Sequence, residues 1–208
     1  MARESRDRDV DGFGRWADTY DRSFLQRLLF APVHDAMLAQ ATAACPSPSA
    51  VLDVGCGTGQ FLRKVALRFP DAWLTGIDAA ADMVRVARAG VPEGAPIRIV
   101  EGFAEQVPFA DDSFDLVLTT MSFHHWADQR TALHDMQRVL SPRGVFVLAD
   151  LLATGPAVVL RAGWWGRFNT PAGLAQMLRG AGLEVDRLVR VPRVPGCVRV
   201  VVARPRAL

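Results

Sequence analysis

Short apolar runs alternate with helical patterns along most of this chain, and that alternation constrains the fold more than any other feature. The apolar runs lie at 50–54, 72–77, 97–100, 114–120 and 144–148, and helical patterns lie between most of them, at 61–69, 80–88 and 128–140. Strands joined by helical crossovers pair in parallel and carry helices on both faces of the sheet. The sequence therefore predicts an α/β fold with a doubly wound sheet.

The C-terminal part predicts a helix followed by a strand pair. Thr170 supplies a capping oxygen, Pro171 stands at the first helical position, and Gly182 is a natural stop. Two strand-like runs follow, 183–191 and 197–203, and the five residues between them are too few for a crossover helix. We expect that pair to be antiparallel.

The N-terminal part is less regular. Residues 1–12 are mostly charged and predict a flexible lead-in. We expect one domain from 13 to 208, which begins with a helical segment over 13–44. Pro32 interrupts the apolar spacing of the 21–44 stretch, so two short helices are predicted there, with Ser141-Pro142 as a later turn.

Composition excludes several classes of function. The formal net charge is +2, acids and bases are interspersed, and no binding to nucleic acid is implied. The three cysteines form no CxxC pair, which argues against a zinc site or any other metal site, and against a disulfide framework. A charged N-terminus without an apolar run behind it predicts neither secretion nor membrane insertion, so a cytoplasmic protein is expected.

The most informative segment is Val51-Leu-Asp-Val-Gly-Cys-Gly-Thr-Gly59, in which a strand runs directly into glycines and a helix. Alternate glycines let the backbone pass close to a nucleotide-like ligand at the carboxyl end of the first strand. The GxGxG spacing and Asp53 disfavour a pyrophosphate and favour a ligand with a cationic group. A second acid, Asp78, ends the next strand, where it can accept hydrogen bonds from ribose hydroxyls.

These motifs resemble a known family. Five segments carry the resemblance: Val51 to Gly59, Gly76-Ile-Asp78 with Met83, Ala104 to Val117, Phe123-His-His-Trp126 and Arg138 to Gly144. They follow one another as in the class I S-adenosylmethionine-dependent methyltransferases, in the group that includes the ubiquinone and menaquinone methyltransferases. The resemblance covers about 13–205. It implies a Rossmann-like sheet of seven strands, six parallel and the last antiparallel.

The resemblance also implies cofactor-binding residues for S-adenosylmethionine and its product S-adenosylhomocysteine. Asp53, Gly55, Cys56 and Gly57 would form the methionine end, and Asp78 would hold the ribose. The adenine and the remaining cofactor surface would involve Ala79, Met83, Phe103, Ala104, Thr119 and the lid residue Tyr20. Phe103 departs from the family pattern, because members often carry an acid there that recognises the adenine amino group. We therefore hypothesise a weakened cofactor affinity.

The methyl acceptor is expected beyond the fourth strand. His124 and His125 are interpreted as the histidines near the chemistry, and one of them could serve as a general base or merely hold the backbone. Aromatic residues that could line an acceptor pocket are Trp16, Trp126, Trp164 and Trp165. Alignment alone can accelerate methyl transfer, so a dedicated base is optional.

Two functions from different classes follow from this pattern. The first is an enzyme that methylates an oxygen, carbon or nitrogen atom of a small-molecule acceptor, as a monomer or homodimer. The second is a catalytically inactive cofactor-binding or interaction protein on the same fold. A nicotinamide-dependent oxidoreductase shares the strand–glycine–helix element, but the glycine spacing and Asp53 disfavour it.

Overall fold

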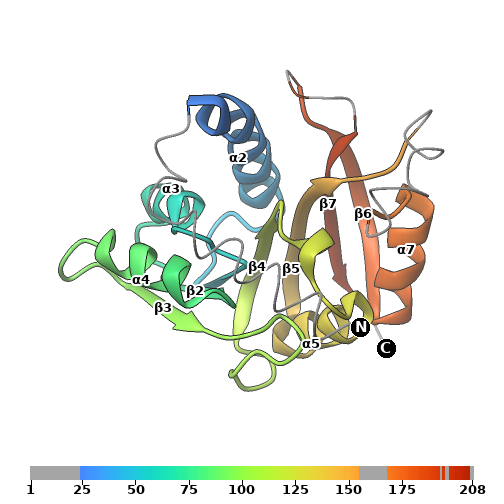
Figure 1. The fold of residues 1–208 in the computed structure, drawn as a ribbon. Coiled ribbons are helices and arrows are strands. Elements are labelled where there is room, and N and C mark those ends of the chain that lie inside the picture. Colours follow the sequence, from blue (N-terminus) through green and yellow to red (C-terminus); the bar gives the residue numbers. More distant parts are fainter. Residues whose placement is uncertain (1–23, 155–167, 193, 195–196, 207–208) are drawn as a thin grey trace.

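A computed structural model describes residues 24–154, 168–192, 194 and 197–206. In this part of the chain, one seven-stranded sheet runs through the molecule in the order β3-β2-β1-β4-β5-β7-β6 (Figure 1). Its strands are β1 (Ala50–Val54), β2 (Trp73–Asp78), β3 (Ile97–Glu101), β4 (Phe114–Thr120), β5 (Leu140–Leu151), β6 (Leu183–Arg190) and β7 (Val198–Pro205). The pairings from β3 to β5 are parallel, whereas β7 is antiparallel to both β5 and β6. The predicted topology is confirmed.

Helices cover both faces of this sheet. The helices α2 (Phe24–Ala44), α3 (Gln60–Arg68) and α4 (Ala81–Ala89) pack on one face, and α5 (Gln129–Val139) and α7 (Pro171–Gly180) pack on the other. A short 3-10 turn, η1 (Phe123–His125), follows β4. Thr170 caps α7 as predicted, because its hydroxyl accepts a hydrogen bond from the Gly173 amide at 3.0 Å.

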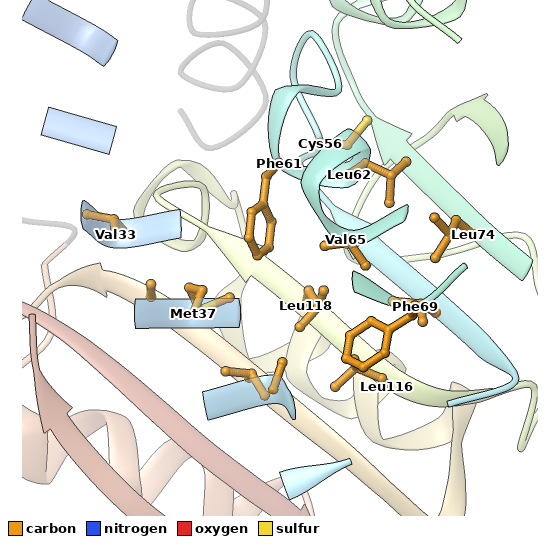
Figure 2. Close-up of a cluster of buried hydrophobic side chains, with 14 of the residues drawn as sticks. Val33, Met37, Cys56, Phe61, Leu62, Val65, Phe69, Leu74, Leu116 and Leu118 are labelled. Atoms are coloured by element: carbon orange, nitrogen blue, oxygen red, sulfur yellow. The ribbon is translucent and has the colours of Figure 1, made fainter. Parts of the chain in front are cut away.

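Successive strand residues supply the two cores, as the period of a strand requires. Along β4, Leu116 and Leu118 point into the first core with α2, α3 and α4, and Val117 points into the second with α5 and α7. Figure 2 shows the first core, in which Phe61 of α3 and Met37 of α2 gather around the β4 leucines. Burial on both faces explains why the centre of β4, Leu116 to Leu118, is continuously apolar.

Two local predictions were wrong. The stretch 24–44 forms one helix with Pro32 inside it, instead of two short helices. A proline within a helix costs a hydrogen bond, but the buried face of Val33, Met37 and Ala41 packs on the sheet and outweighs that loss. The predicted turn at Ser141-Pro142 belongs to the start of β5, which pairs with β4 through Leu140 and continues past an irregularity in the pairing.

Other predictions fall outside the described residues. The flexible lead-in 1–12 and the first part of the helical segment 13–44 lie there, so neither is tested. Within the described helices, none is long and apolar enough to cross a membrane. Cys45, Cys56 and Cys197 are free thiols, and none of them is paired with another.

Candidate functional site

Two adjoining cavities lie at the carboxyl ends of β1, β2 and β4. The first has a volume of about 140 Å³ and is lined by predicted cofactor residues on one side and by η1 on the other. The second, of about 70 Å³, lies between the glycine turn and α2. Of the predicted residues, the first cavity holds Gly55, Gly57, Asp78, Ala79, Met83, Phe103, Ala104, His125 and Trp126, and the second holds Asp53, Gly55, Cys56 and Gly57. Ligands bind at this edge of a doubly wound sheet.

The glycine turn connects the two cavities. Gly55, Gly57 and Gly59 have φ angles of 73°, 54° and 76°, the left-handed region that side chains disfavour. The Gly55 amide donates to the Ile77 carbonyl at 2.8 Å, which holds the turn against β2. A Cβ added at Gly55 would fall on the side chain of Ser122, just before η1. The turn and η1 therefore approach each other as closely as a glycine permits.

Asp78 stands at the end of β2 and organises the turn. Its carboxylate accepts hydrogen bonds from the Gly57 amide at 2.8 Å and from the Ala80 amide at 2.9 Å. Desolvation raises the pKa of Asp78, while these backbone donors oppose the shift. Each carboxylate oxygen has two lone pairs, so Asp78 retains acceptor capacity for ligand hydroxyls.

Asp53 is fully buried at 1% exposure, and its Oδ2 atom has no hydrogen-bond partner. Burial, with a smaller contribution from the nearby Asp78, raises its pKa to about 7. An unpartnered buried acid is costly to retain. It becomes favourable when a cationic group enters the second cavity and stabilises the carboxylate.

The end of β4 differs from the prediction by one residue. Thr119 is fully buried and is absent from the lining of both cavities, whereas Thr120 lines both of them. The hydroxyls of both threonines are buried without a partner. The next residue, Met121, also lines the first cavity and has a φ of 53°, a conformation that an ordinary side chain adopts rarely and mostly at functional turns.

Phe103 lies at the open side of the first cavity with 39% of its surface exposed. Its neighbour Glu105 also lines the cavity, but the Glu105 carboxylate accepts hydrogen bonds from the amides of Ala127 and Asp128, at 2.8 and 3.0 Å. That carboxylate therefore fixes the segment after η1. The predicted weakness in adenine recognition stays a prediction.

His124 and His125 occupy different environments within η1. The Nδ1 atom of His124 lies 2.7 Å from Oδ1 of the buried Asp150, and the His124 amide donates to Oδ2 of the same carboxylate at 2.9 Å. The two imidazole centroids are 3.9 Å apart, and His125 alone of the pair lines the first cavity. Asp150, at the end of β5, escaped prediction because nothing in the sequence marks this acid as a partner for a residue 26 positions away.

The aromatic residues of the predicted acceptor side are only partly described. Trp126 is 8% exposed, lines the first cavity and donates from Nε1 to the Ser122 hydroxyl at 3.2 Å. Its ring packs edge-on against Phe123. The lid residue Tyr20 and the pocket residues Trp16, Trp164 and Trp165 lie outside the described residues.

A third histidine stands near the site, contrary to the prediction that only His124 and His125 do so. His34 of α2 is 6% exposed and lines the second cavity together with Asp53. The sequence reveals this position only through the helical spacing of Phe30 and His34, which is equally typical of ordinary packing.

Comparison with known proteins identifies the family. The family model described as "Methyltransferase domain" matches residues 52–148. The chain is 37% identical over 126 residues to the uncharacterized methyltransferase YcgJ of Bacillus subtilis, covering 59% of this chain and 48% of that protein. It is 32% identical over 187 residues to malonyl-acyl-carrier-protein O-methyltransferase of Methylococcus capsulatus, covering 85% and 66%. The structure of a SAM-dependent methyltransferase from Aquifex aeolicus superposes with a TM-score of 0.72 at 20% identity, covering 90% and 97%.

The chain belongs to the class I S-adenosylmethionine-dependent methyltransferases. It spans about half to two thirds of the length of the curated relatives it matches. The cavities of this methyltransferase suit the family's cofactor in two respects. The unpartnered Oδ2 of Asp53 can accept a hydrogen bond from a cationic group, and the left-handed glycine turn places backbone atoms at the edge of both cavities.

Proposed function

We propose that this chain transfers a methyl group from S-adenosylmethionine to an oxygen, carbon or nitrogen atom of a small-molecule acceptor. The observation that supports this most is that Asp53 and Asp78 face two joined cavities at the glycine turn, the first of which is also bordered by η1. A cofactor that extends through both cavities would meet an acceptor on the η1 side of the first cavity, which aligns donor and acceptor. We expect the reaction to take place in the cytoplasm.

In this proposal, each end of the site has its own task. Asp53 pairs with the cofactor ammonium, Asp78 accepts hydrogen bonds from the ribose hydroxyls, and Met83 with Phe103 borders the adenine. The bound cofactor supplies a sulfonium whose methyl group is already electrophilic. Thr120 and Met121, at the junction of β4 and η1, orient the reacting partners.

The acceptor side depends on η1. Asp150 holds the His124 backbone and ring together, so that η1 keeps one position relative to β5. His125 and Trp126 then border the acceptor. For a hydroxyl or amine acceptor, His125 is the side chain placed to receive a proton, because it lines the cavity and an imidazole nitrogen can accept one.

Thermal unfolding tests the cofactor half of this proposal. Purified protein is melted with S-adenosylmethionine, S-adenosylhomocysteine, NAD or buffer, alongside Asp53→Ala and Asp78→Ala. A ligand at about 100 times its Kd stabilises by about 2.7 kcal/mol, which raises Tm by roughly 5–10 °C in a chain of this size. We expect that shift with the two sulfur compounds only, and its loss in both variants. Asp71→Ala, an exposed acid before β2, is the matched control.

Product formation tests the transfer half. Release of S-adenosylhomocysteine is measured with a panel of hydroxyl, amine and activated-carbon acceptors. Turnover with any of them supports the enzyme. Cofactor binding without turnover across the panel would favour the inactive cofactor-binding protein, and a thermal shift with NAD alone would contradict the proposal.

A further inference from the structure

The polar side chains that line the second cavity include those of Asp53, Thr120 and His34. Oδ2 of Asp53 and the hydroxyl of Thr120 are buried without a hydrogen-bond partner. His34 is 6% exposed and faces the same cavity. Buried polar groups are normally hydrogen-bonded, so the two orphaned oxygen atoms indicate that a polar ligand completes this cavity beside His34.

The imidazole ring of His34 packs against two aromatic rings. Its ring centroid lies 4.9 Å from that of Phe61 on α3 and 6.0 Å from that of Phe30, one turn earlier on α2. Burial, with the nearby Lys64 cation adding to the effect, lowers the pKa of His34 to about 4. The imidazole is therefore neutral near pH 7, and a neutral ring has one N–H donor and one acceptor nitrogen.

The surroundings of His34 favour an anionic group on its side of the cavity. A groove between α2 and α3 adjoins the cavity through Phe30, His34 and Gln60, and Arg63 and Lys64 line this groove. Asp53, by contrast, faces the cavity from β1 with an acceptor that suits a cation. The cavity thus has an acidic wall on the sheet side. On the helix side it has the His34 imidazole, near Lys64, which pairs with the exposed Asp35, and near Arg63, which donates to the Thr58 carbonyl.

A small group with a cation at one end and a carboxylate at the other matches both walls. We propose that His34 binds the carboxylate of the cofactor's amino-acid end, donating its ring N–H, so that α2 forms part of the cofactor site. The inference rests on the proposed function. It assigns a binding role to a helix outside the matched family segment, 52–148.

Calorimetric titration with two ligands tests this role. S-adenosylhomocysteine carries the amino-acid end, and 5′-methylthioadenosine lacks it. In His34→Phe, which keeps an aromatic ring against Phe61, we expect the Kd for S-adenosylhomocysteine to rise about ten-fold or more and the Kd for 5′-methylthioadenosine to stay within about two-fold. Ala39→Ser, on the exposed side of α2, is the matched control and should change neither Kd.

The outcomes separate this inference from its premises. Equal weakening of both ligands by His34→Phe would show a structural role only, and unchanged affinity for S-adenosylhomocysteine would show no contact; either result overturns the inference. If the wild type binds neither ligand, both the proposed function and this inference are overturned. Should the variant not fold, the ring-nitrogen resonances of His34 in the wild type serve instead. These resonances should move on addition of S-adenosylhomocysteine and not of 5′-methylthioadenosine.

Discussion

At the scale of single residues, the site contains buried polar groups that have no hydrogen-bond partner in the ligand-free protein and that a ligand could satisfy. Asp53 is buried without a partner for Oδ2, and its pKa is raised to about 7. Thr120 adds an unpartnered hydroxyl between the two cavities. Such groups weaken the ligand-free fold and become satisfied when a complementary ligand binds.

The first prediction concerns Asp53→Asn. In the unfolded chain this carboxyl ionises near 3.8, whereas in the folded protein it ionises near 7. Between these values the folded state keeps a proton that the unfolded state has lost, so this group makes stability fall as pH rises from about 4 to about 7 and level off above. The asparagine variant lacks that fall. We expect it to be more stable than the wild type at about pH 8, by on the order of 1–3 kcal/mol.

Urea unfolding at about pH 5 to about pH 8 measures this difference. Wild-type affinity for S-adenosylhomocysteine should rise with pH through about 7, because the ionised carboxylate pairs with the ammonium, and the variant should bind weakly at every pH. Parallel stability curves for the two proteins would contradict the assignment.

The strand pattern predicted the position of the two acids better than that of the residues at the end of β4. Asp53 and Asp78 lie at the carboxyl ends of β1 and β2, so their placement needed only the strand pattern. At the end of β4, Thr119 was predicted and Thr120 lines the cavities, because alternate strand residues face opposite sides and the sequence does not reveal which side is which. Asp150 and His34 could not be assigned, since their roles depend on contacts with distant elements.

At the scale of elements, the glycine turn and the residues before η1 approach each other closely where both line the first cavity. Gly55 lies against Ser122, whose hydroxyl also accepts from Trp126 Nε1. A change at the turn therefore reaches Trp126 through one short chain of contacts. The prediction of helix 24–44 failed at this scale for a related reason, because packing on the sheet outweighed the local preference of Pro32.

The second prediction compares Gly55→Ala with Gly94→Ala. Both glycines have a left-handed φ, 73° and 76°, but only at Gly55 would the new Cβ meet another side chain. Gly94→Ala should cost about 1 kcal/mol from backbone strain alone. Gly55→Ala should cost more, by about 1–3 kcal/mol, and should abolish the thermal shift with S-adenosylhomocysteine. Similar unfolding curves and similar ligand shifts in the two variants would show that the approach to Ser122 is unimportant.

At the scale of the whole molecule, a few polar clusters tie the cavity walls to the rest of the fold. Asp115 on β4 accepts from the amides of Ser49 and Ala50, which fixes the start of β1 beside β4. Arg138 on α5 donates to the carbonyls of Val107 and Phe109 and pairs with Asp135 and Asp111. These bonds anchor the segment 107–111, which continues from the cavity residues 102–105. The parallel, doubly wound sheet was predictable from the alternation, but these cross-links depend on the completed packing.

The third prediction is therefore that Arg138→Ala affects both stability and the distant cavity. The variant leaves two backbone carbonyls and the half-buried Asp135 without their guanidinium partner, and we expect a loss of about 3 kcal/mol in urea unfolding. We also expect weaker binding of 5′-methylthioadenosine, because the adenine side of the cavity continues from the anchored segment. Arg85→Ala removes an exposed pair with Asp82 three residues away, which should cost less than about 1 kcal/mol and leave binding unchanged. If the two arginine variants lose equal stability, or if Arg138→Ala binds as the wild type does, the segment is positioned by other contacts.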